Sequence, residues 1–253
     1  MRELYLKSFL DTPISTMFVE LGWLPLASFT ETMCDPIVRM FYSNIIEHDL
    51  DESYLKSSLF RIVVKVTLEV IAKVLGIPLV EAPSVSDLEI TYELLDRVFI
   101  DLWGKVRGQL GSVVHISSIS CHAWVLATFL TFSVYLSSHR ADICKKGCII
   151  LSEFLQREPI NLASSILEEI IVRGDPSVSK KVVLSYDILI TKLCQRARVE
   201  FLVNSFFLKP MVPLIPHLGI EVRNRLRVPL VIRRRCVVVE LRAKLVKVTQ
   251  IQL

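Results

Sequence analysis

The clearest fold signal is the segment from His122 to Asp175, which reads HAWVLATFLTFSVYLSSHRADICKKGCIILSEFLQREPINLASSILEEIIVRGD. After a short gap, Val183–Val199 continues with VLSYDILITKLCQRARV. Apolar residues recur in both segments at helical spacing, and short polar joints separate them. Asn161 occupies an N-cap position, and Gly174 follows the same run where a left-handed residue often ends a helix. We therefore expect helices that pack directly against one another.

Helix-start signals also mark the first half of the chain. Thr12-Pro13 and Asp35-Pro36 each place proline at a first helical turn, and the second predicts a helix over Ile37–Ile46. Thr67 is expected to cap a helix that Gly76 ends. Ser86 and Glu89 fit a capping box, which predicts a helix to about Trp103. Its expected core residues are Leu88, Tyr92, Leu95 and Phe99.

One segment is typical of a strand. Leu59–Val66 reads LFRIVVKV and is rich in β-branched residues, which favour extended backbone. The predicted fold is thus mainly α: a multi-helix globular domain of about eight helices with one short β-strand or hairpin element. We assign this domain to residues 1–205, a Pro-containing linker to 206–220 and a basic C-terminal extension to 221–253. The alternating Cys236–Val248 fits either a strand pair or a helix.

Charge is unevenly placed along the chain. The 253 residues carry a formal charge of +4, but residues 221–253 alone carry +7, which leaves −3 for residues 1–220. Clustered arginines neutralise phosphates and make nucleic-acid binding salt-dependent. A solvated tail and a nuclear-import patch are alternative interpretations of the same cluster. The candidate nucleic-acid-binding residues are Arg223, Arg225, Arg227, Arg233, Arg234 and Arg235.

The cysteines indicate a reducing compartment. Six are scattered along the chain, and Arg2, Glu3 and Lys7 interrupt any apolar signal core at the start. We therefore expect an intracellular protein, in the cytoplasm or the nucleus. Cys144 and Cys148 lie one helical turn apart near His139, and Cys121-His122 would complete a zinc site. Two half-buried thiols explain this spacing better, and we expect no metal and no cofactor.

A long uncharged segment raises the question of a membrane. Residues Gly108–His139 contain no Asp, Glu, Lys or Arg, and residues 119–136 have the length of a bilayer span. Ser120, His122 and Thr128 lower the apolar character of this segment. A buried core helix is therefore the preferred interpretation, with a membrane-attached protein as an alternative.

Several short motifs occur in an order that is similar to the plant transposon protein domain, a family of gag-like, transposon-derived plant proteins. The likeness covers roughly residues 15–200. It runs from Gly22-Trp23 through Leu75-Gly76-Ile77-Pro78 to Pro159-Ile160-Asn161-Leu162. Where the family has a VRG hairpin, this chain has Phe60-Arg61-Ile62. The matching residues that we expect to have structural roles are Trp23, Phe41, Tyr42, Asn44, Gly76, Pro78, Trp124, His139, Asn161 and Tyr186.

The resemblance implies a non-enzymatic structural and interaction domain, because the family carries no catalytic residues to transfer. Self-association, other mobile-element proteins and nucleic acid at the basic tail are the expected partners. The rival function is a metal-dependent transposase-like strand-transfer enzyme, which needs about three converging carboxylates. The available acids lie on predicted helix faces or caps, where solvation is the usual role: Asp87, Asp96, Asp101, Asp142, Glu153, Glu168, Glu169 and Asp187.

Overall fold

The computed structural model describes residues 13–29, 31–82, 84–104, 113–115, 119–135, 142–175, 186–201 and 207–208. The chain divides into two units, Met1–Leu214 and Ile215–Leu253, and all the described residues lie in the first. His139 and the arginines of the basic tail lie outside the described residues.

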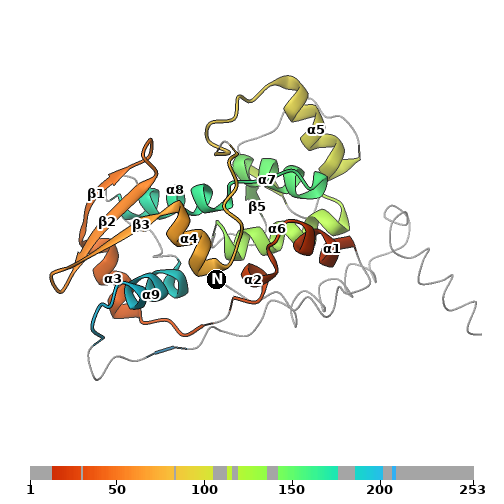
Figure 1. Ribbon diagram of the computed structural model, residues 1–253. Coiled ribbons are helices and arrows are strands. Elements are labelled where there is room, and N and C mark those ends of the chain that lie inside the picture. Colours follow the sequence, from red (N-terminus) through yellow and green to blue (C-terminus); the bar gives the residue numbers. More distant parts are fainter. Residues whose placement is uncertain are drawn as a thin grey trace, which may run out of the picture. The chain divides into compact units, whose positions relative to one another are not determined.

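The described residues form nine helices and two small sheets (Figure 1). The helices are α1 (Pro13–Glu20), α2 (Leu24–Ala27), α3 (Asp35–Ser43), α4 (Leu68–Leu75), α5 (Tyr92–Trp103), α6 (Cys121–Ser133), α7 (Lys145–Gln156), α8 (Leu162–Gly174) and α9 (Asp187–Arg196). Strands β1 (Ile45–Asp49), β2 (Tyr54–Leu59) and β3 (Ile62–Thr67) form an antiparallel sheet in that order. Strands β4 (Val113–His115) and β5 (Asp142–Cys144) form a second antiparallel pair. The mainly helical prediction is confirmed, with more strand than we expected.

The three-stranded sheet corrects two predictions. Leu59–Val66 is a hairpin and not one strand, because Phe60 and Arg61 turn the chain and Leu59 pairs with Ile62. The helix predicted over Ile37–Ile46 ends at Ser43, and Ile45 already belongs to β1. Asn44 ends that helix by donating its side-chain amide to the Met40 carbonyl, 2.8 Å away.

One face of this sheet packs on helices α3, α8 and α9 (Figure 1). The inward residues of β2 and β3 alternate with exposed ones, as a half-buried sheet requires. Ser57 is buried on this face, and its hydroxyl lies 2.7 Å from the Phe41 carbonyl and 3.1 Å from that of Asn44. The apolar inward residues are Leu55, Leu59, Val64 and Val66.

Helix α6 is a core helix. Its residues from Ala123 to Thr131 are all buried. Phe129 meets Phe18 of α1 edge to face, with ring centroids 5.0 Å apart, and α7 packs along the same helix. Among the described residues, no helix combines the length and the apolar character that a bilayer span needs.

Local end signals predicted most, but not all, of the helix boundaries. Thr67 caps α4 and Asn161 caps α8 through their side chains, as expected. Helix α5 begins at Tyr92 with Thr91 as its cap, so the predicted capping box at Ser86 is wrong. Tyr92 is 84% exposed, whereas Val98, Phe99 and Leu102 form the buried face. Gly174 is not left-handed; it lies against Ile45, where a Cβ atom would overlap the isoleucine side chain.

Candidate functional site

Two of the sequence motifs meet in space. Gly22 precedes Trp23 and lies against Pro78, while Gly76 lies against Pro25. Trp23 is buried and its ring lies 5.0 Å from that of Phe154 on α7. These motif residues therefore fix the position of α2 beside the end of α4.

The other motif residues that the structure describes are also buried or hydrogen-bonded within the domain. Phe41 and Tyr42 are buried on α3 and meet edge to face, with centroids 5.8 Å apart. Asn161 donates to the Ala82 carbonyl at 3.3 Å in addition to capping α8. Tyr186 is fully buried and donates its hydroxyl to the Val134 carbonyl, while burial raises its pKa well above the usual tyrosine value. Trp124 is buried within α6.

Of the candidate metal ligands, the structure describes the side chains of Cys144 and Cys148. Among the residues that the structure describes, no three His, Cys, Asp or Glu side chains are placed to hold a metal ion. Cys144 is the N-cap of α7, and its sulfur accepts from the Gly147 amide at 3.4 Å. Cys148 is buried, which raises its pKa to about 12 and favours the neutral thiol.

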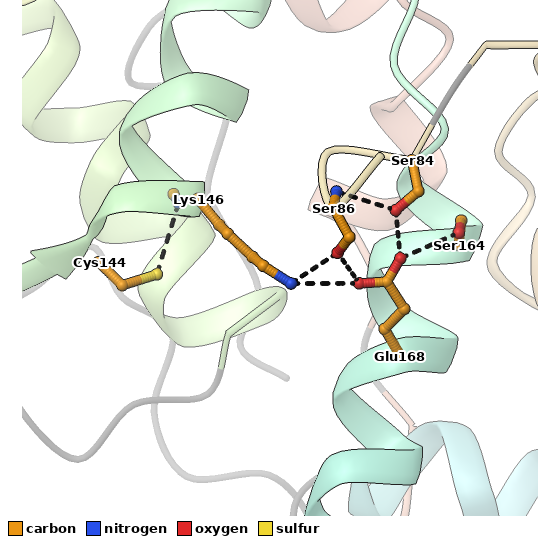
Figure 2. Close-up of polar contacts among 7 residues, drawn as sticks. Ser84, Ser86, Cys144, Lys146, Ser164 and Glu168 are labelled. Carbon is orange, nitrogen blue, oxygen red and sulfur yellow. Dashed lines mark hydrogen bonds and ion pairs between the residues drawn. The ribbon is translucent and has the colours of Figure 1, made fainter. Parts of the chain in front are cut away.

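A polar cluster surrounds Glu168 at the junction of three segments (Figure 2). Ser84 and Ser86 of the 77–91 loop each donate a hydroxyl to its carboxylate. Ser164, one turn earlier on α8, donates at 3.5 Å, and the Lys146 ammonium on α7 lies 3.4 Å away. The Glu168 side chain is only 19% exposed, so these contacts replace water around a half-buried charge. The cluster ties the loop to α7 and α8.

This cluster was missed from the sequence. We interpreted Ser86 as a helix cap and Glu168 as a solvated helix residue. The contacts join residues more than 80 positions apart in the chain, and no local spacing signals them. Their only sequence trace is the pair of serines, Ser84 and Ser86, and the spacing from Ser86 to Glu89 assigned Ser86 to a helix cap instead.

The cluster contains a lysine beside a serine. Lys146 Nζ lies 2.6 Å from Ser86 Oγ, a pair that resembles the base and nucleophile of some hydrolases. A general base must accept a proton, but the Lys146 ammonium donates to Ser86 and to Glu168. Its side chain is also 55% exposed, so solvent surrounds the charge.

The outer face of the three-stranded sheet carries the first exposed apolar surface. Lys56 pairs across the strands with Glu47 on one side and Lys65 on the other. Both lysine ammonium groups lie over the Tyr54 ring, at 4.9 and 5.2 Å from its centroid. Exposed apolar side chains occupy the adjoining end of the sheet. We define the sheet surface as Ile46, Lys56, Phe60, Arg61, Val63 and Lys65.

Helix α5 carries the second exposed apolar surface. Its opposite side is fixed to α7, where Asp101 accepts from Ser152 and Gln156, each at 2.5 Å. Arg97 of α5 also pairs with Glu153 of α7. Burial raises the pKa of the Glu153 carboxyl, and the positive charge of Arg97 counteracts this rise. The outward residues combine acids with large apolar side chains. We define the α5 surface as Glu89, Ile90, Tyr92, Glu93, Asp96 and Ile100.

The described unit is thus a mainly helical domain, with a sheet and a helix that expose apolar side chains. A family model described as "Putative plant retrotransposon-related domain" matches residues 19–200. The chain belongs to this family. Neither the comparison with curated proteins nor that with solved structures finds a match.

Proposed function

We propose that this retrotransposon-related protein is a non-enzymatic, gag-like structural module. Its described domain associates with copies of itself, and its basic tail attracts nucleic acid. The observation that carries the proposal is the placement of large apolar side chains beside charges on two exposed surfaces. Contiguous exposed apolar side chains are typical of surfaces that bind partners.

Local conflicts on the sheet surface support a binding role. Lys56 and Lys65 stand directly opposite each other, an arrangement that weakens strand pairing. Phe60 and Arg61 both have positive φ angles, 49° and 68°, which cost bulky side chains about 1–2 kcal/mol each. Contact with a partner would explain why such unfavourable residues occur at an exposed position.

The character of the polar cluster supports a non-enzymatic role. The Glu168 carboxylate accepts hydrogen bonds from three serine hydroxyls and pairs with the Lys146 ammonium. Both oxygens of the carboxylate are engaged, Oε1 by Ser84 and Ser164 and Oε2 by Ser86 and Lys146. The cluster is better suited to holding the 77–91 loop in place.

The nucleic-acid part of the proposal rests on charge in residues 221–253. Six arginines within Arg223–Arg235 can each neutralise one phosphate. On single-stranded RNA, six such contacts would give a plot of log affinity against log salt a slope of about −4. The tail would thereby bring nucleic acid to an assembly that the domain builds.

The experiment combines light scattering with a salt titration on the full chain. The expected result is a molar mass that rises with concentration, together with RNA binding that weakens as salt increases. Replacing the six arginines by glutamine should flatten the salt slope and leave the mass unchanged. A monomer at every concentration would refute self-association, and salt-independent binding would refute the role of the tail. If only a second mobile-element protein raised the mass, that protein would replace the copy as partner.

A further inference from the structure

We propose that the sheet surface of one copy binds the α5 surface of another copy. This inference rests on the proposed function, because it names the two surfaces through which self-association occurs. The contact is heterologous: two different surfaces meet, and each copy offers one of each. A chain built in this way carries a free sheet surface and a free α5 surface after every addition.

Charge complementarity selects this pairing. The sheet surface contains Lys56, Arg61 and Lys65, and the neighbouring Glu47 already pairs with Lys56 at 2.7 Å. The α5 surface contains three exposed acids, Glu89, Glu93 and Asp96. Two sheet surfaces would place like charges together, and so would two α5 surfaces. Glu47 and Asp49 also stand on this face of the sheet, opposite Lys56 and Tyr54, so its excess of positive charge comes from Arg61 and Lys65. The largest number of opposite charges meets when a sheet surface faces an α5 surface.

The apolar side chains match as well. Phe60 and Val63 on the sheet surface are 45% and 53% exposed. On the α5 surface, Tyr92 is 84% and Ile100 51% exposed. Tyr92, Asp96 and Ile100 stand at successive four-residue steps, so they form one stripe along the helix. Each surface thus combines an exposed aromatic side chain with apolar and charged neighbours, a composition that protein interfaces favour.

Both surfaces are built on well-anchored elements. The sheet rests on α3, α8 and α9, and α5 rests on α7 through Arg97, Asp101 and buried apolar residues. Neither surface therefore needs to rearrange in order to bind. Preorganised surfaces of this kind lose little conformational entropy on association.

The test uses charge reversal in the full chain. Lys65→Glu disables the sheet surface, and Asp96→Lys disables the α5 surface. Each variant alone should associate about tenfold or more weakly than the unmodified chain, since like charges then face each other. An equimolar mixture should recover association, because the intact α5 surface of one variant meets the intact sheet surface of the other. The chain with both reversals should also recover it, because its two altered surfaces again complement each other.

Matched controls are Arg196→Glu and Glu158→Lys, two exposed positions outside both surfaces. These variants should associate like the unmodified chain in sedimentation-velocity measurements. Circular dichroism of every variant establishes that it is folded.

The outcomes separate this inference from the proposed function. An unmodified chain that stays monomeric overturns both. Association that persists in Lys65→Glu and Asp96→Lys, or a mixture that does not recover, overturns the pairing but leaves self-association standing. Loss of RNA binding in Lys65→Glu without loss of association overturns the pairing and assigns the sheet surface to nucleic acid.

Discussion

Gly76 lies so close to Pro25 that a Cβ atom added to the glycine would stand 2.8 Å from the proline Cβ. Gly22 lies in the same way against Pro78, where the added atom would be 3.1 Å from Cδ. Both glycines have a left-handed φ of 68°. The two motifs thus interlock, and each glycine is required by its backbone conformation and by its neighbour.

Gly76→Ala should therefore destabilise the domain strongly. The left-handed conformation costs alanine about 1–2 kcal/mol, and overlap with the rigid proline ring adds about 1–3 kcal/mol. We expect the free energy of unfolding to fall by about 2–5 kcal/mol in urea denaturation.

Gly104→Ala is the matched control for that variant. Gly104 ends α5 with a φ of 69°, but nothing lies within 4 Å of an added Cβ. Only the conformational cost applies, so the loss should be about 1–2 kcal/mol. Equal losses in the two variants would show that the contact with Pro25 has no energetic role.

Local signals explain what the sequence predicted correctly about the fold. Adjacent residues mark both ends of α4: Thr67 caps its start, and the left-handed Gly76 ends it. The β1 strand has no such signal: IIEHD mixes polar and apolar residues, and its place comes from pairing with β2. Helix α5 starts later than predicted because Ser86 is drawn to Glu168, a partner 82 positions away.

The features of the candidate site also divide into those that the sequence signals and those that it does not. The basic tail and the motif residues could be found by composition and order. The Glu168 cluster and the two surfaces could not, because tertiary packing brings the cluster together and decides which faces of the sheet and of α5 stay exposed. The exposed face of α5 shows the difference clearly: Tyr92 fits an apolar helical stripe in the sequence, yet the helix turns it to solvent.

Glu168→Gln should loosen the 77–91 loop. The amide removes the charge that pairs with Lys146 and that accepts from Ser84 and Ser86. Hydrogen bonds to a charged group contribute about 1.5–3 kcal/mol, so a loss of about 1–3 kcal/mol is expected. Hydrogen exchange measured by mass spectrometry should become faster at Val85 and Ser86.

Glu169→Gln provides the adjacent control. Glu169 pairs with Arg173 on its own helix at 2.7 Å and does not contact the loop. It should leave exchange in the 77–91 loop unchanged. Unchanged exchange in Glu168→Gln as well would mean that the loop is held by other contacts.

Replacing Phe60-Arg61 by Asn-Gly should stabilise the domain and weaken self-association. A two-residue hairpin turn with positive φ at both positions favours Asn-Gly, so relief of strain should raise the free energy of unfolding by about 1–2 kcal/mol. The same change removes an apolar and a basic side chain from the sheet surface. Denaturation and sedimentation velocity on one sample measure the two effects.

Ser53→Gly separates the effect on stability from the effect on self-association. Ser53 also has a positive φ, 51°, but it lies in the turn between β1 and β2, outside the sheet surface. This variant should gain stability and keep its association. If Asn-Gly at the hairpin also kept full association, Phe60 and Arg61 would have no part in the contact.

The buried thiols should make the domain sensitive to alkaline pH. Burial raises the pKa of Cys148 and of Cys194 to about 12, above the ordinary thiol value of 9.0. Above pH 9 the unfolded chain loses these protons while the folded chain retains them. The stabilising contribution is therefore complete below pH 9 and declines as pH rises toward 12, by about 1.4 kcal/mol per pH unit for each fully titrating group.

Urea denaturation at pH 8, 8.5, 9 and 9.5, under reducing conditions, measures this dependence below the ordinary tyrosine pKa of 10.0. Cys194→Ala removes one of the two titrations, so its stability should fall less steeply with pH, even though the cavity lowers its stability at pH 8. Because Cys148 remains in that variant, part of the slope should persist, and Cys148→Ala/Cys194→Ala should flatten it further. A slope that stays the same in all three proteins would mean that ionisation of these thiols does not limit folding.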